Sequence, residues 1–247
     1  MAVVAKPLGR YLVGGLLTAG ILIGGAGVVT YAFVPRKAVR QLPPDTTRPV
    51  KYVALGDSTV YGVGAGSPAN NYVSRLYERL RSVYPRARLV NLGVSGATAA
   101  DVLEAQLGRA AALRPDLVTL SIGPNDITRG RDVQQYEQDI QTILQRLTRQ
   151  TTAVVVLNLI PDLTVTPRFR GKESAAAVGQ RVLLFNEALS RQARAHSAEV
   201  VDLYTPSQQE VLRHPELIAT DGYHPSDQGY ARWAELMWQG VEARIQR

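Results

Sequence analysis

The chain has 247 residues, of which 45% are hydrophobic and 20% charged, with a formal net charge of +7 and no cysteine. This composition excludes a disordered or collagen-like protein, and the absence of cysteine excludes disulfides, thiolate zinc sites and a cysteine nucleophile. Five of the 28 basic residues lie in residues 1–44, which hold no acid, so 23 bases face 21 acids in the remainder. That balance argues against a nucleic-acid-binding face, and three scattered histidines lead us to expect no metal and no other cofactor.

The first predicted element is a run of 24 residues without a charge, residues 11–34. As a helix it would be about 36 Å long, enough to cross a hydrocarbon core of about 30 Å. The run suits an uncleaved membrane anchor or a signal peptide, and its length favours the anchor, while basic residues on both sides leave the orientation open. We therefore expect residues 1–44 to form a membrane segment and the start of a linker. Residues 45–247 would be a domain outside the cytoplasm, anchored, or secreted if the segment is cleaved.

Residues 41–49 contain three prolines and predict a short semi-rigid linker. Beyond them, short β-branched runs alternate with stretches of helical spacing. We expect strands at 50–55, 89–92, 117–122, 152–159 and 199–203, and helices at 72–83, 99–113, 132–147, 175–196 and 227–245. This alternation predicts βαβ units and hence a three-layer α/β/α fold, in which helices cover both faces of a five-stranded parallel sheet.

Polar motifs follow the predicted strands. In a parallel sheet, ligands bind at the carboxyl ends of the strands, so these positions carry the functional information. The motifs are Gly-Asp-Ser at 56–58, Asn-Leu-Gly-Val-Ser-Gly at 91–96, Gly-Pro-Asn-Asp at 123–126 and Asp-Gly-Tyr-His-Pro at 221–225, the last after a strand and a short helix. Each motif alone is also a good polar turn. Their joint placement at one edge of the sheet predicts a common site.

In this order, the four motifs resemble the blocks that define the SGNH/GDSL hydrolase family of esterases and lipases. The resemblance covers about residues 50–247 and implies a flavodoxin-like domain. It implies Ser58 as the nucleophile and Asp221 with His224 as its partners in a catalytic triad. It further implies an oxyanion hole made of Ser58, Gly93 and Asn125. Thr59 stands where the family often has leucine or isoleucine, a departure that leaves the chemistry intact.

The residue types also fit ester hydrolysis on chemical grounds. A serine hydroxyl is a weak nucleophile, so a base must take its proton as it attacks a carbonyl. Histidine can accept that proton and later deliver it to the leaving alcohol. Asp221 lies three residues before His224, close enough to hold the second ring nitrogen. His196, near a predicted helix C-terminus, is interpreted as a surface residue favoured by the helix dipole, and His214, which has no acid three residues before it, as part of the loop structure.

The motifs do not select one substrate. Small acyl esters, lysophospholipid-like lipids and O-acetylated sugars are all implied by the resemblance, with an acyl-enzyme on Ser58 as the intermediate. Two alternatives stay open: acyl transfer to a sugar acceptor, and a non-catalytic binding domain on the same fold. Residues 161–172 follow the fourth strand and include Arg168, Arg170 and Lys172. This loop is either a solvated basic surface or the place where an anionic substrate is met.

Overall fold

A single parallel sheet organises the protein in the computed structural model, which describes residues 39–246. Its five strands lie in the order β2-β1-β3-β4-β5. In chain order they are β1 (Lys51–Gly56), β2 (Arg88–Asn91), β3 (Leu117–Ser121), β4 (Val154–Asn158) and β5 (Glu199–Val201). The expected five-stranded parallel sheet is therefore confirmed, and β5 is shorter than predicted.

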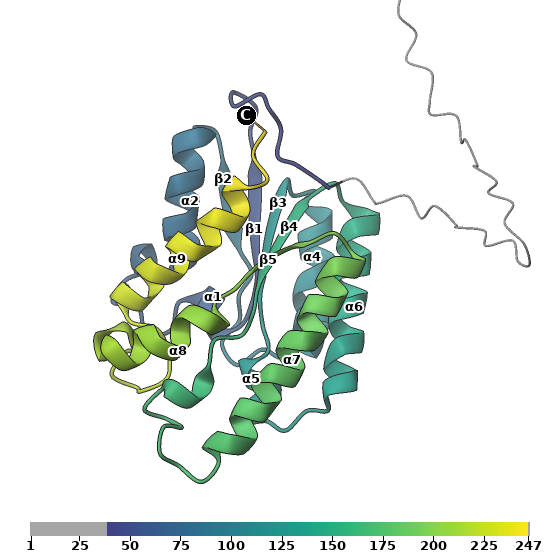
Figure 1. Ribbon diagram of the computed structural model, residues 1–247. Coiled ribbons are helices and arrows are strands. Elements are labelled where there is room, and N and C mark those ends of the chain that lie inside the picture. Colours follow the sequence, from purple (N-terminus) through teal and green to yellow (C-terminus); the bar gives the residue numbers. More distant parts are fainter. Residues whose placement is uncertain (1–38, 247) are drawn as a thin grey trace, which may run out of the picture. The chain divides into compact units, whose positions relative to one another are not determined.

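Helices cover both faces of this sheet, which gives the three expected layers (Figure 1). One face is covered by α2 (Tyr72–Val83) and α9 (Asp227–Glu242), and the other by α4 (Leu107–Ala112), α6 (Val133–Gln150) and α7 (Ala175–Ala195). Neighbouring strand residues serve opposite layers because side chains alternate along a strand. Tyr52 and Ala54 of β1 accordingly belong to the core beneath α2 and α9, whereas Val53 and Leu55 belong to the core beneath α6 and α7.

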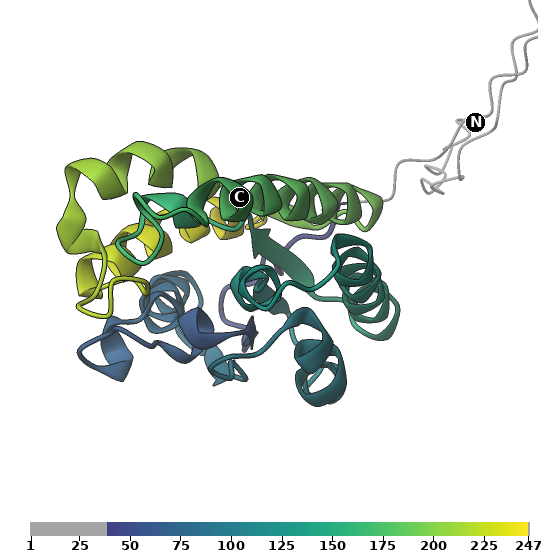
Figure 2. The same ribbon diagram turned by 90° about the horizontal axis from the view of Figure 1, so that it is seen from below.

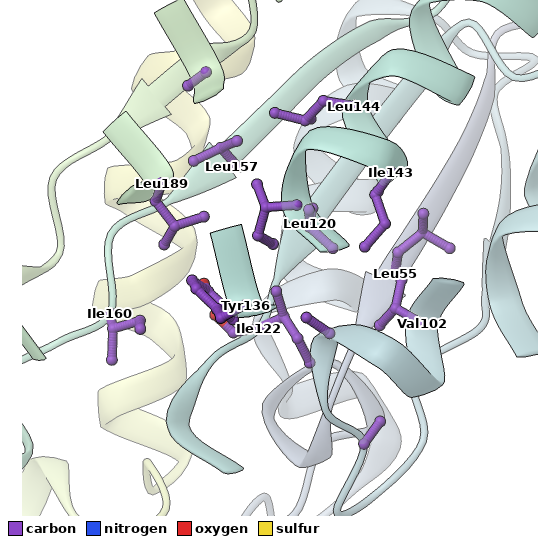
Figure 3. Close-up of a cluster of buried hydrophobic side chains, with 14 of the residues drawn as sticks. Leu55, Val102, Leu120, Ile122, Tyr136, Ile143, Leu144, Leu157, Ile160 and Leu189 are labelled. Carbon is purple, nitrogen blue, oxygen red and sulfur yellow. The ribbon is translucent and has the colours of Figure 1, made fainter. Parts of the chain in front are cut away.

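The larger core lies between the sheet, α6 and α7. Figure 3 shows Leu55, Leu120 and Leu157 of three neighbouring strands directed toward side chains from these two helices, among them Ile143 and Leu189. All five side chains are almost completely buried. This packing makes the centre of the sheet a rigid support for the residues at its carboxyl edge.

The helix predicted at 99–113 is divided into three parts. A first turn, α3 (Ala99–Asp101), is followed by a π-helical turn, η2 (Val102–Gln106), and then by α4. The buried Gln106 ends the π-helical turn and pairs with the backbone of Gly56, whose N–H it accepts at 2.9 Å and whose carbonyl oxygen it binds at 2.8 Å. The turn thereby holds the end of β1 in place.

Short helices follow the carboxyl ends of three strands. They are α1 (Ser58–Tyr61) after β1, α5 (Pro124–Thr128) after β3 and α8 (Tyr204–Arg213) after β5. Three 3-10 turns complete this edge, η1 (Pro68–Asn70), η3 (Leu163–Val165) and η4 (Pro215–Leu217). Figure 2 views the molecule from below, the side on which these connections lie. The polar motifs are therefore gathered on one side of the sheet.

The segment predicted to be a semi-rigid linker, residues 41–49, is partly packed against the domain. Leu42 is buried, and its N–H donates to the carbonyl oxygen of Arg244 at 2.7 Å. The Arg40 guanidinium donates to the carbonyl oxygens of Thr148 and Ala153 at 2.6 and 3.1 Å. An apolar side chain in this segment finds a place in the core, so residues 40–42 belong structurally to the domain.

The predicted membrane segment, residues 11–34, lies outside the described residues. Within residues 39–246, no helix combines the length and the apolar character that a bilayer crossing requires.

Candidate active site

Ser58, His224 and Asp221 form a continuous chain of hydrogen bonds. The Ser58 hydroxyl lies 2.9 Å from Nε2 of His224, and Nδ1 of His224 lies 2.6 Å from Oδ2 of Asp221. Ser58 stands in the first turn of α1, whereas the other two residues lie in the loop between η4 and α9. The fold therefore brings together three predicted residues, the first of which is 166 positions from the histidine.

The orientation of Asp221 is determined by the backbone of its own loop. Oδ1 accepts the N–H groups of Tyr223 and His224 at 2.9 and 3.0 Å, which leaves Oδ2 for the imidazole. Partial burial raises the pKa of Asp221, but the hydrogen bonds from His224 and Tyr223 outweigh it, so the pKa lies below its ordinary value. A charged carboxylate at Nδ1 keeps a proton on that nitrogen and leaves Nε2 free to accept one.

The turn that presents Ser58 depends on its two preceding residues. Gly56 has φ +144°, and a Cβ there would lie 1.9 Å from the carbonyl oxygen of Ser121, so only glycine fits. Asp57 is buried and caps α1, because Oδ1 accepts the N–H and the hydroxyl of Thr59 at 2.9 and 2.8 Å. Burial raises the pKa of Asp57 to about 6. Asp57 therefore shapes the turn that aims Ser58.

Asn125 reaches the same edge from α5. Its side-chain amide donates one N–H to the carbonyl oxygen of Ala97 at 3.0 Å, and an amide nitrogen has two hydrogens. The second N–H stays available. The backbone N–H of Ser58, in the first turn of α1, has no acceptor among residues 39–246. Both groups can therefore donate to a substrate oxygen.

Gly93, in contrast, has already used its only donor. Its N–H donates to Oδ1 of Asn91 at 2.9 Å. A Cβ on Gly93 would lie 2.6 Å from Cγ1 of Val60 and 2.7 Å from the backbone nitrogen of Tyr61. Glycine is needed here because the loop packs against α1. The structure does not support the predicted role of Gly93 as an oxyanion-hole donor.

The second glycine of the same motif is placed differently. Gly96 has φ +82°, a conformation that favours glycine, and within residues 39–246 its N–H has no acceptor. Its carbonyl oxygen accepts from the Arg129 guanidinium at 2.8 Å, and the next residue, Ala97, is the one that Asn125 binds. Gly96 therefore lies in the loop that Asn125 contacts. Both glycines belong to the motif at 91–96, and their backbone conformations and local hydrogen bonds distinguish them.

The sequence of this protein agrees with the geometry of the site. Residues 54–232, most of the chain, match the sequence model of the GDSL-like Lipase/Acylhydrolase family. The chain belongs to this family. Membership of the GDSL-like Lipase/Acylhydrolase family makes it a carboxylic ester hydrolase.

Several relatives show how far the likeness extends. Esterase TesA of Pseudomonas aeruginosa is 25% identical over 187 residues, which are 75% of this chain and 85% of that protein. Among solved structures, the α/β hydrolase LAE5 from the metagenome of Lake Arreo, Spain, has a TM-score of 0.65 at 23% identity, covering 80% of this chain and 97% of its own. The acetyl xylan esterase AlAXEase has a TM-score of 0.65 at 19% identity, covering 78% and 100%. The structural likenesses establish the shared fold.

In this GDSL-like hydrolase, a salt bridge supports the loop beside Asn125. The Asp126 side chain is fully buried and accepts the N–H of Ala99 at 3.1 Å and a guanidinium N–H of Arg131 at 2.8 Å. Burial raises the pKa of Asp126, and Arg131 offsets part of that effect. Arg131 also binds Asp139 at 2.9 Å. Sequence reasoning missed Arg131, because its role depends on a contact between a loop and two helices.

A largely apolar cavity of about 100 Å³ adjoins Ser58 and His224. It lies between η3, α8, η4 and α9, and sequence reasoning did not anticipate it. Apolar side chains form most of its lining, among them Leu163, Val211, Leu217, Ile218, Tyr223 and Trp233. An apolar part of a substrate can therefore be buried directly beside the hydroxyl of Ser58.

Proposed function

We propose that this protein is a serine esterase that forms an acyl-enzyme on Ser58. The hydrogen-bonded chain from Ser58 through His224 to Asp221 carries this proposal, with distances of 2.9 and 2.6 Å. His224 takes the serine proton at Nε2 while the serine oxygen attacks the ester carbonyl carbon. The proton then passes to the alcohol oxygen as the carbon–oxygen bond breaks. Water repeats the sequence on the acyl-enzyme and releases the acid.

The negative charge on the tetrahedral intermediate requires donors that are free before the substrate binds. We assign this role to the N–H of Ser58, the second amide N–H of Asn125 and the N–H of Gly96 in place of Gly93. Each assignment is supported by a donor that the surrounding protein leaves unused. A single donor of this kind contributes about 3 to 4 kcal/mol to the transition state.

The cavity beside Ser58 supports an acyl group longer than acetyl. The cavity has a volume of about 100 Å³, and an apolar cavity of about 150 Å³ holds the six carbons of benzene, so this one holds about four carbons. The lining is apolar, so each methylene buried there contributes about 0.8 kcal/mol. An acyl chain of about four carbons fits this space. A dodecanoyl chain would have to extend beyond it.

A series of p-nitrophenyl esters tests this function. We expect butanoate to be hydrolysed with a higher kcat/KM than acetate or dodecanoate. Ser58→Ala should abolish turnover, and Asn125→Ala should lower kcat by about 100-fold to 1000-fold. Ser82→Ala, an exposed serine on α2, is the matched control and should behave as wild type. Turnover that survives in Ser58→Ala would overturn the proposal.

A further inference from the structure

The loop after β4 places a cation on the ring of Tyr223, the residue before His224. The Arg168 backbone N–H donates to the carbonyl oxygen of Gly222 at 3.0 Å. Its guanidinium carbon lies 4.5 Å from the ring centre of Tyr223 and 5.5 Å from that of Phe169. The Tyr223 ring is itself 5.1 Å from the His224 ring. Two aromatic rings and a backbone bond therefore hold Arg168 beside the triad.

This guanidinium has no acidic partner in the described part of the chain. Its side chain is exposed, and its N–H groups donate to no protein acceptor among residues 39–246. Asp221 binds His224 and its own loop, and Asp162, which lies in the same β4–α7 connection as Arg168, caps η3 through Thr164. A guanidinium stacked on a ring keeps its N–H donors in a plane and open to the solvent.

The direction of proton transfer determines which half of the ester lies near Arg168. His224 delivers its proton to the alcohol oxygen, so the alcohol half of the ester must lie against the imidazole. The Tyr223 ring lies beside the imidazole, and the Arg168 guanidinium stacks on the Tyr223 ring. The acyl half has its place in the apolar cavity, which Tyr223 also lines. A group on the alcohol half that passes Tyr223 therefore comes within reach of the guanidinium.

We propose that Arg168 binds an anionic group on the alcohol half of the ester, a phosphate or a carboxylate. Both anions accept paired hydrogen bonds from a guanidinium. The inference rests on the esterase function proposed above and adds a preference for negatively charged esters.

Three butanoyl esters with different alcohol halves test the proposal. They are the neutral butanoyl glycerol, butanoyl glycerol 3-phosphate and the butanoyl ester of glycolate, which carries a carboxylate. We would measure kcat and KM for wild type, Arg168→Gln and Arg168→Lys. Arg149→Gln is the matched control, since Arg149 is exposed in the last turn of α6. Thermal melting shows whether each variant is folded.

For wild type we expect kcat/KM to be higher for at least one charged ester than for the neutral one. Arg168→Gln should lower the ratio of charged to neutral kcat/KM about tenfold, mainly through the KM of the charged ester, as expected for the loss of one charge-assisted hydrogen bond. Arg168→Lys should retain part of the preference, Arg149→Gln should keep all of it, and added salt should weaken it. The charged ester whose kcat/KM falls in Arg168→Gln identifies the anion.

The two ways in which this experiment can fail are distinguishable. If wild type hydrolyses all three esters and Arg168→Gln leaves the ratio unchanged, the role of Arg168 is overturned while the esterase function stands. If wild type hydrolyses none of them, the esterase function itself fails.

Discussion

Replacing Asp221 by asparagine should leave the site folded but place the imidazole proton on the wrong nitrogen. Oδ1 of Asp221 accepts two backbone N–H groups at 2.9 and 3.0 Å. In the Asp221→Asn variant, an NH2 group at the Oδ1 position would face two N–H donors, so the amide oxygen must occupy that position. The amide NH2 then points at Nδ1 of His224, which becomes an acceptor. The ring proton moves to Nε2, and Nε2 can no longer take the proton of Ser58.

The size of this effect follows from the loss of the base. A histidine held in the wrong tautomer lowers kcat by about 10⁴-fold in a comparable triad. At 1.36 kcal/mol per factor of ten, that is about 5 kcal/mol of activation free energy. Because both backbone hydrogen bonds persist, the free energy of unfolding should change little.

The assay is kcat for p-nitrophenyl butanoate at neutral pH, with urea unfolding measured on the same samples. Asp132→Asn is a matched control, because Asp132 also accepts two backbone N–H groups, at 2.9 and 3.1 Å, and lies at the start of α6. We expect that control to retain wild-type kcat. A loss of less than tenfold in folded Asp221→Asn would refute the tautomer argument.

Three further predictions concern the surroundings of the triad. Burial raises the pKa of Asp57 from the ordinary 3.8 to about 6, so the folded chain holds this proton more tightly than the unfolded chain. Wild-type unfolding free energy should therefore lose up to about 3 kcal/mol as the pH rises between these values. Asp57→Asn should remove that dependence in urea titrations, and an unaltered pH profile would exclude Asp57 as its source. Arg131→Gln should cost about 3 kcal/mol of unfolding free energy, because it leaves the buried Asp126 carboxylate unpaired, whereas a cost below about 1 kcal/mol would make the pair unimportant. Val211→Trp should fill the cavity and lower the butanoate-to-acetate ratio of kcat/KM at least about tenfold, and an unchanged ratio would place the acyl chain elsewhere.

The sequence predicts the three central strands, β1, β3 and β4, well because they are buried on both faces. Val154–Asn158 is a nearly continuous apolar run, as expected for a central parallel strand. β5 ends at Val201 instead of 203, since residues 202–203 turn toward α8, which begins at Tyr204. Helices α1 and α5, with four and five residues, are too brief to show a periodic pattern.

The triad could be predicted because strand ends and motif order bring Ser58 and His224 to one edge. The choice between Gly93 and Gly96 could not be predicted, since it depends on one hydrogen bond within the loop, which the Gly93 N–H donates to the Asn91 side chain. Gln106 acts through contacts between distant segments, for which a single sequence carries no signal. The sequence does single out the basic loop that contains Arg168, but not the stacking of Arg168 on Tyr223. The membrane segment and the extracytoplasmic location stay predictions.

The central claim is that Ser58 is an activated nucleophile. A fluorophosphonate probe phosphonylates only an activated serine, and mass spectrometry of the digested protein locates the label. We predict a single label on the peptide that contains Ser58, none in Ser58→Ala, and strongly slowed labelling in His224→Ala. A label on another serine, or undiminished labelling in Ser58→Ala, would contradict the account.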